Sequence, residues 1–236
     1  MSRTKLTRTL IGAGLTLILS SVGLVPASAA SAPVITWQTS IVDGASYVFG
    51  EVPAAPTCEA TEDLVPVTCT VEGYSTAVGT VVLTATGFGS DGLTNTVETR
   101  TYTVTPWTFK GFDKPVKANV VNKVKAGSTV PLKFRVYQGD TEATSISVVQ
   151  SITAQQYECT TQALIGSPVS VTGKSKGHRL SYSDGRFRQN WKTPKLPKKP
   201  AVTKVKGKKP AAPATCYIVV LTTQDSSTLS AKFQLK

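Results

Sequence analysis

Short runs of β-branched and aromatic residues recur along this chain, and each run ends at Gly, Pro, Asp or Ser. Beyond the N-terminal region no stretch keeps a helical apolar period over three turns, so the pattern predicts strands. The strands that we expect lie at 34–38, 46–50, 66–73, 79–87 and 94–104, then at 129–137, in a hairpin at 179–192, and at 216–223 and 227–236. This spacing predicts an all-β chain with two antiparallel β-sandwich-like domains in tandem.

The clearest single strand is TVPLKFRVY at 129–137. Its apolar residues Val130, Leu132, Phe134 and Val136 alternate with polar or amphipathic ones, which predicts a strand with one buried face. Pro131 cannot donate a hydrogen bond to a neighbouring strand, so we expect it at a sheet edge or near a strand start.

The first 29 residues predict a signal peptide. Arg3, Lys5 and Arg8 precede an apolar stretch at 10–25, and the small residues Ala27-Ser28-Ala29 follow it, which indicates cleavage before Ala30. A membrane span is a weaker interpretation because Gly, Thr and Ser interrupt the short apolar stretch. We expect a secreted, extracellular protein without a transmembrane segment in the mature chain, either released or associated with the cell surface.

Charge divides the remaining chain into two parts. Residues 30–105 hold eight acids and one cation, a net charge of −7, whereas residues 106–236 hold 22 cations and six acids, a net charge of +16. Such a step predicts two separately built domains, an immunoglobulin-like one at 30–105 and a second β-domain at 106–236.

Four cysteines follow the predicted cleavage site: Cys58, Cys69, Cys159 and Cys216. An even number in an exported chain indicates disulfides, and three pairings are possible. We favour Cys58–Cys69 and Cys159–Cys216, because each then stays within one predicted domain. The chain-entropy model values these two loops at about 3 and about 4 kcal/mol. Zinc is a poor alternative, because the chain has no C-x2-C pair and one histidine.

Two stretches resemble known families. The segment from Asp43 to Val104, with its two cysteines, GYSTAVGT and terminal TRTYTV, resembles the immunoglobulin-like repeats of exported actinobacterial proteins. The segment GFDKPVKANVVNKVKAGSTVPLKFRVY, with FRQNWKTPK and CYIVVLTTQDSSTLSAKFQLK further on, resembles the PxKF-type domain, whose motif stands here as Pro131-Leu132-Lys133-Phe134. The resemblance implies a secreted or surface module without an assigned biochemical activity.

A lysine-rich stretch departs from that family pattern. About 18 residues, roughly 196–214, separate NWKTPK from the next strand, and they are almost entirely Lys, Pro, Ala, Val and Gly. The prolines and like charges favour an extended loop. In one interpretation the loop binds an anionic cell-wall polymer, and in the other it is a solvated insertion in a structural spacer without a ligand. The candidate polyanion-binding residues are Lys192, Lys195, Lys198, Lys199, Lys204, Lys206, Lys208 and Lys209. Specific nucleic-acid recognition is not expected, because no aromatic residue interleaves these lysines.

Enzymatic chemistry finds little support in the sequence, so we predict a non-enzymatic module with no catalytic residue, cofactor or metal. His178 lies in a Lys/Gly-rich stretch, and most acids of the second part sit in turn sequences, where Asp bonds its own backbone. An extracellular hydrolase is a remote alternative that would need paired carboxylates. Oxygen ligands for calcium are available in the first part, at Glu59, Glu62, Asp63 and Asp91, but no D-x-D-x-D-G loop orders them. Trp191, beside Lys192, is either a core residue or a platform for a sugar.

Overall fold

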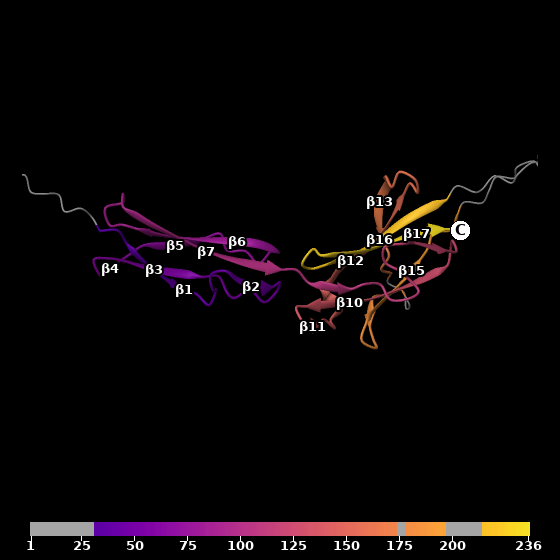
Figure 1. The fold of residues 1–236 in the computed structure, drawn as a ribbon, viewed down its shortest axis with the longest axis horizontal. Helices are drawn as coiled ribbons and strands as arrows, with labels where there is room; N and C mark the ends of the chain where they lie inside the picture. Colours follow the sequence, from indigo (N-terminus) through magenta and orange to yellow (C-terminus); the bar gives the residue numbers. More distant parts are fainter. Residues whose placement is uncertain (1–30, 174–177, 197–213) are drawn as a thin grey trace, which may run out of the picture.

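The computed structural model describes residues 31–173, 178–196 and 214–236. In these ranges the chain is all-β: two sandwich-like units follow one another end to end, and one 3₁₀ turn, η1 (Ile146–Val148), is the sole helical element (Figure 1). No helix in the described part is long and apolar enough to cross a membrane. The stretch assigned to a signal peptide, 1–29, lies outside the described residues.

The first sandwich contains strands β1 to β7 and packs two sheets face to face. One sheet has the order β1-β3-β4 and the other β2-β7-β6-β5, and β2 runs parallel to β7 while the other pairs are antiparallel. The strands are β1 (Val34–Gln38), β2 (Ala45–Val48), β3 (Thr57–Glu62), β4 (Val65–Val67), β5 (Cys69–Glu72), β6 (Gly79–Phe88) and β7 (Asn95–Thr105). Between the sheets, Ile35 and Ala60 pack against Ala85.

The second sandwich contains strands β8 to β17. One sheet has the order β11-β10-β15-β14 with β8 also paired to β10, and the other has the order β13-β12-β16-β17-β9, in which β9 runs parallel to β17. The strands are β8 (Thr108–Lys110), β9 (Val121–Val124), β10 (Thr129–Gln138), β11 (Thr141–Glu142), β12 (Val149–Tyr157), β13 (Leu164–Ser170), β14 (Ser181–Tyr182), β15 (Phe187–Lys192), β16 (Thr215–Thr223) and β17 (Thr228–Leu235).

Strand β10 has the buried face that its alternation predicts. Leu132, Phe134 and Val136 are fully buried, and Phe134 stacks on Phe187 of β15 with ring centroids 5.3 Å apart. Pro131 lies opposite Asn190 of β15, whereas β8 accompanies β10 only from Arg135 onward. Among the described strands β10 therefore has one neighbour at the proline, which suits a residue without a backbone N–H.

The two disulfides join Cys58 to Cys69 and Cys159 to Cys216, with Cα–Cα distances of 5.7 and 5.4 Å. This is the pairing favoured from the sequence. The first bridge links β3 to β5 and so ties the two sheets of the first sandwich together. The second links the end of β12 to the start of β16.

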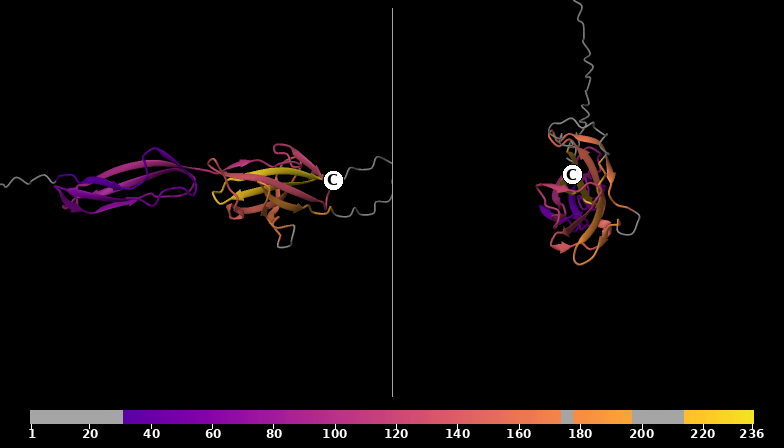
Figure 2. Two further views of the ribbon diagram at one scale, coloured as in Figure 1. Left: turned by 90° about the horizontal axis from the view of Figure 1, so that it is seen from below. Right: turned by 90° about the vertical axis from the view of Figure 1, so that its right-hand side faces the viewer.

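The two sandwiches meet at a packed joint. Trp107, in the short connection between β7 and β8, is 4% exposed, and its ring meets the ring of Phe49 edge-on at 5.4 Å. Its Nε1–H donates to the carbonyl of Phe49 (2.9 Å), and its backbone N–H donates to Asp225 Oδ2 (2.7 Å). Because Phe49 follows β2 and Asp225 lies in the β16–β17 turn, this tryptophan holds both sandwiches in one end-to-end arrangement (Figures 1 and 2).

Asp225 makes the joint sensitive to acid. Burial raises the pKa of this carboxyl, but hydrogen bonds from Ser227, Thr223 and the Trp107 N–H outweigh it, so the pKa lies below the ordinary 3.8. A lowered pKa stabilises the fold above the unfolded-state value, and this contribution is lost as the pH falls through the folded-state value.

Substituting Asp225→Asn should therefore lower the free energy of unfolding at pH 7 by about 1–3 kcal/mol, because hydrogen bonds to a charged acceptor are lost. The difference in unfolding free energy between the two proteins should narrow as the pH falls from 3.8 toward the lower pKa of the folded state, because the unfolded chain takes up the proton first. Urea denaturation of both proteins at pH 7 and in the acid range measures this. A gap that is independent of pH would contradict the assignment.

Candidate functional site

Three separate chain segments meet at the end of the second sandwich that faces away from the joint. The start of β10 lies opposite the end of β15, and the end of β17 lies beside the end of β9. Backbone hydrogen bonds connect them: Gly127 N–H donates to the Pro194 carbonyl (3.0 Å) and Ala126 N–H to the Lys236 carbonyl (3.0 Å). Residues 123–128, 192–196 and 232–236 thus form one surface.

This surface carries five exposed lysines, which we call the lysine end: Lys123, Lys125, Lys192, Lys195 and Lys236. The buried Thr193 fixes two of the segments to each other, since its Oγ1–H is within hydrogen-bonding distance of the carbonyls of Ser128 (2.9 Å) and Lys125 (3.2 Å). The lysines therefore project from a well-ordered part of the fold.

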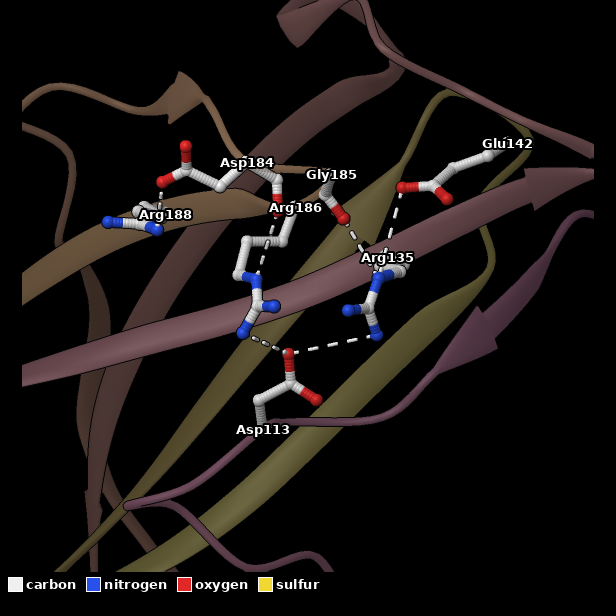
Figure 3. A network of polar contacts seen from close by, with 7 residues as sticks. All are labelled: Asp113, Arg135, Glu142, Asp184, Gly185, Arg186 and Arg188. Carbon is white, nitrogen blue, oxygen red and sulfur yellow. Dashed lines mark hydrogen bonds and ion pairs between the residues drawn. The ribbon is translucent and has the colours of Figure 1, made fainter.

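Acidic residues of the second sandwich lie mostly elsewhere, in contact with arginines or with the joint. Asp113 is 3.3 Å from Arg186 and 3.8 Å from Arg135, and Glu142 also approaches Arg135 (Figure 3). Every ion pair among the described residues uses arginine, and none uses lysine; the fourth is Arg188 with Asp184. The lysine end is consequently rich in positive charge, and none of its lysines forms an ion pair with an Asp or Glu of the described residues.

Glu158 follows β12, whose last residue Tyr157 pairs with Cys216 near the start of β16. Its carboxylate accepts hydrogen bonds from the backbone N–H groups of Thr161 and Thr160 and from the Thr160 hydroxyl. Led by the bond from Thr161, these contacts lower its pKa to about 2. The charge of Glu158 is directed into its own turn rather than toward a lysine.

The predicted polyanion-binding lysines fall partly outside the described residues. Lys192 and Lys195 belong to the lysine end, whereas Lys198, Lys199, Lys204, Lys206, Lys208 and Lys209 lie outside the described ranges. The described residues that flank this segment are Leu196, next to Lys195, and Ala214, next to the start of β16. Cys216, which forms the bridge with Cys159, is two residues after Ala214.

Sequence reasoning missed Lys123, Lys125 and Lys236 as members of this surface. Lys123 and Lys125 lie about 70 residues before Lys195, and Lys236 lies about 27 residues after Lys209. The parallel pairing of β9 with β17 brings Lys236 beside 123–126, and the hydrogen bond from Gly127 to Pro194 brings that segment beside Lys195. The sequence Lys125-Ala126-Gly127-Ser128 is typical of a turn, but a turn signal does not identify the spatial neighbours of the turn.

A hollow of about 550 Å³ lies beside the lysine end, between β13 and the end of β15, and Lys192, His178 and Tyr217 contribute to its wall. Trp191 also lines it but is 3% exposed and packs edge-on against Phe233 with centroids 4.9 Å apart. This burial decides between the two interpretations of Trp191, since its face is occupied by the core and is not a platform for a sugar.

The described residues do not assemble a recognisable catalytic or metal site. His178 Nδ1 lies 3.3 Å from the carbonyl of Asn190, and no triad partner for it is recorded in the described ranges. There, no three side chains of His, Cys, Asp or Glu converge as metal ligands would.

Two of the four calcium candidates of the first sandwich, Glu62 and Asp91, accept hydrogen bonds from nearby backbone N–H groups. Glu62 is buried and accepts from the N–H of Ser90 (2.7 Å), and Asp91 accepts from the N–H groups of Leu93 and Thr94 (2.8 Å each).

Neither a family model nor a curated protein matches the chain. Solved structures with similar architecture include fibronectin(III)-like modules of Clostridium thermocellum CbhA (14% identity, 86% of this chain and 93% of that one, TM-score 0.25). A tandem of titin Ig domains (12%, 88% and 97%, TM-score 0.23) and a Dpr two-Ig fragment in complex with a DIP protein (12%, 87% and 99%, TM-score 0.29) are others. The TM-scores of these structures are low, so the fold assignment rests on the strand pairings described above.

Proposed function

We propose that this chain is an exported, non-enzymatic β-module that attaches to anionic cell-envelope polymers through its lysine end and the adjoining lysine-rich stretch. The observation that supports this most strongly is the convergence of five exposed, unneutralised lysines from three chain segments at one end of the molecule. The resemblance of the second sandwich to PxKF-type domains of exported proteins fits this role.

Lysine suits a polymer whose charge repeats without a fixed geometry. Its ammonium is a hydrated point charge on a flexible stem, so it attracts phosphodiester or carboxylate groups without demanding one orientation. Clustering raises the local potential and speeds encounter with a polyanion. Attraction of this kind is strongly screened by salt, because the Debye length falls from about 30 Å at 0.01 M to about 3 Å at 1 M.

Neutralising the lysines should weaken binding to a glycerol-phosphate polymer of the teichoic type. One variant carries Lys→Gln at 125, 192 and 195, and a second carries it at 198, 199, 204, 206, 208 and 209. Each should weaken binding about tenfold or more, since several screened contacts are lost together. Fluorescence anisotropy with labelled polymer measures the dissociation constant.

The matched controls replace the same positions with arginine, which keeps the charge and should keep most of the binding. If the glutamine variants bind as tightly as the unchanged protein, the polymer does not use these lysines. If no protein binds at low salt, the chain is a spacer without this ligand.

A further inference from the structure

The outer end of the first sandwich has the opposite charge to the lysine end. It consists of the β3–β4 turn and the β6–β7 turn, and it carries Asp63 and Asp91 with the buried Glu62 beneath them, which we call the acidic tip. The two turns are joined, because Ser90 N–H donates to Glu62 Oε2 at 2.7 Å. No Lys or Arg occurs anywhere between residues 31 and 99, so nothing in this part of the chain neutralises the tip.

The acidic tip also displays apolar side chains. Leu64 and Leu93 are 93% and 87% exposed, the highest values among the large apolar residues of the described chain. Leu64 follows Asp63 in the β3–β4 turn, and both have left-handed backbone angles (φ 66° and 48°), so the turn pushes the leucine outward. Each of the two turns of the acidic tip thus presents one acid and one exposed leucine, Asp63 with Leu64 and Asp91 with Leu93.

The lysine end offers a complementary hollow. A depression of about 230 Å³ opens there, walled by Val116, Val124, Val130, Pro131 and Phe233, with Lys125 on its wall. Asn122, Ser128 and Thr129 add polar groups to its lining. Its volume accommodates a leucine side chain, and its charged neighbour is a lysine. One end of the molecule thus has an exposed leucine and acids, and the other end has a partly apolar hollow and lysines.

Within one molecule these two ends cannot meet. Trp107 is hydrogen-bonded to Phe49 on one side and to Asp225 on the other. Gly139 of the second sandwich packs so closely on the first that a Cβ at this glycine would lie 3.2 Å from the Val48 side chain. The sandwiches are held end to end, with the acidic tip and the lysine end at opposite extremes (Figure 2). The complementarity is available only to a second copy.

We propose that copies of this chain associate head to tail, with Leu64 of one copy seated in the Val124–Phe233 hollow of the next and Asp63 beside Lys125. The contact is heterologous, so each added copy leaves one free tip and one free lysine end, and the assembly grows as a filament and does not close as a dimer. Part of the attraction is electrostatic and is weakened by salt.

Sedimentation velocity of the chain from 31 to 236, which holds every described strand, tests this. At about 20 mM salt the average mass should rise with concentration and pass beyond a dimer, and at about 500 mM salt it should fall toward the monomer. A tip variant, Asp63→Asn with Leu64→Asn, keeps residues that tolerate left-handed angles and should associate about tenfold more weakly. Lys125→Gln with Lys195→Gln should have a similar effect.

An equimolar mixture of the two variants gives the sharpest result. Each variant alone should be monomeric, and the mixture should form a 1:1 pair that does not grow, because one intact tip meets one intact lysine end. The tip variant should still bind the anionic polymer, so failure of self-association and failure of polymer binding are distinguishable. A monomer at every concentration, or a mixture that stays monomeric, would overturn the proposal.

Discussion

Replacing Trp107 with alanine should lower the free energy of unfolding of the second sandwich by about 3–5 kcal/mol, the range for truncating a buried aromatic side chain. The indole is 4% exposed and belongs to the same core as Phe134, Phe187 and Phe233. The substitution also removes the Nε1–H donor to the Phe49 carbonyl, which leaves that acceptor unpaired at the joint.

The control for this prediction is Trp107→Phe, which keeps an aromatic ring against Phe49 but lacks the donor. It should cost clearly less than the alanine variant, and urea denaturation followed by circular dichroism measures both. Small-angle X-ray scattering should show that only the alanine variant loses the extended shape, because the ring is what packs the two sandwiches together. A cost under about 1 kcal/mol for alanine would show that the joint is not packed as described.

Removing the Cys159–Cys216 bridge should be the other large effect. The bridge closes a loop of 57 residues, and the chain-entropy model values such a loop at about 4 kcal/mol. Cys216 is 3% exposed at the start of β16, so its replacement by serine also buries a hydroxyl among apolar neighbours. The double variant Cys159→Ser with Cys216→Ser should therefore lose at least that amount in chemical denaturation.

The matched comparison is the double variant Cys58→Ser with Cys69→Ser. It lacks a bridge that closes a loop of 11 residues, so its free energy of unfolding should fall by about 3 kcal/mol. Reducing agent should destabilise the unchanged protein and leave a variant lacking all four cysteines unaffected. Equal stability of the 159/216 variant and the parent would contradict a structural role for this bridge.

The strands that the sequence predicts best are those whose pattern is local. The alternation of β10 identifies its buried face, and the hairpin predicted at 179–192 is confirmed by the pairing of β14 with β15. This hairpin turns at Asp184-Gly185, where both residues have the positive φ that a two-residue turn of type I′ requires. The final hairpin, β16 with β17, also lies where expected.

Other strands could not be predicted from the sequence, because their residues lack a local strand pattern and form strands only by pairing with a neighbouring strand. Strand β12 contains Gln155 and Gln156, which weaken its apolar pattern, yet eight of its residues pair with β16. Strand β13 contains Gly166 and Pro168 and is exposed throughout, so no periodicity identifies it. Strand β9 is four residues long and is held by parallel pairing with a strand more than 100 residues away.

The same limit applies to the candidate site. The lysine-rich stretch is visible in the sequence as a run of like charge, and so Lys192 and Lys195 could be identified. The contributions of Lys123 and Lys125 depend on the hydrogen bonds that bring 123–128 against 192–196. Among the described residues no lysine of the lysine end forms an ion pair with Asp or Glu, and Asp113 and Glu142 pair with Arg135 elsewhere, which no local pattern shows.

The most direct test of the proposed attachment is co-sedimentation of the chain from 31 to 236 with purified Gram-positive cell wall across a salt series. The proposal predicts that the protein pellets with the wall at about 20 mM salt and is released well before about 500 mM, because screening removes lysine–polyanion attraction. Wall stripped of its anionic polymers should not retain it. Protein that stays in the supernatant at low salt, or pellets equally at every salt concentration, would contradict the proposal.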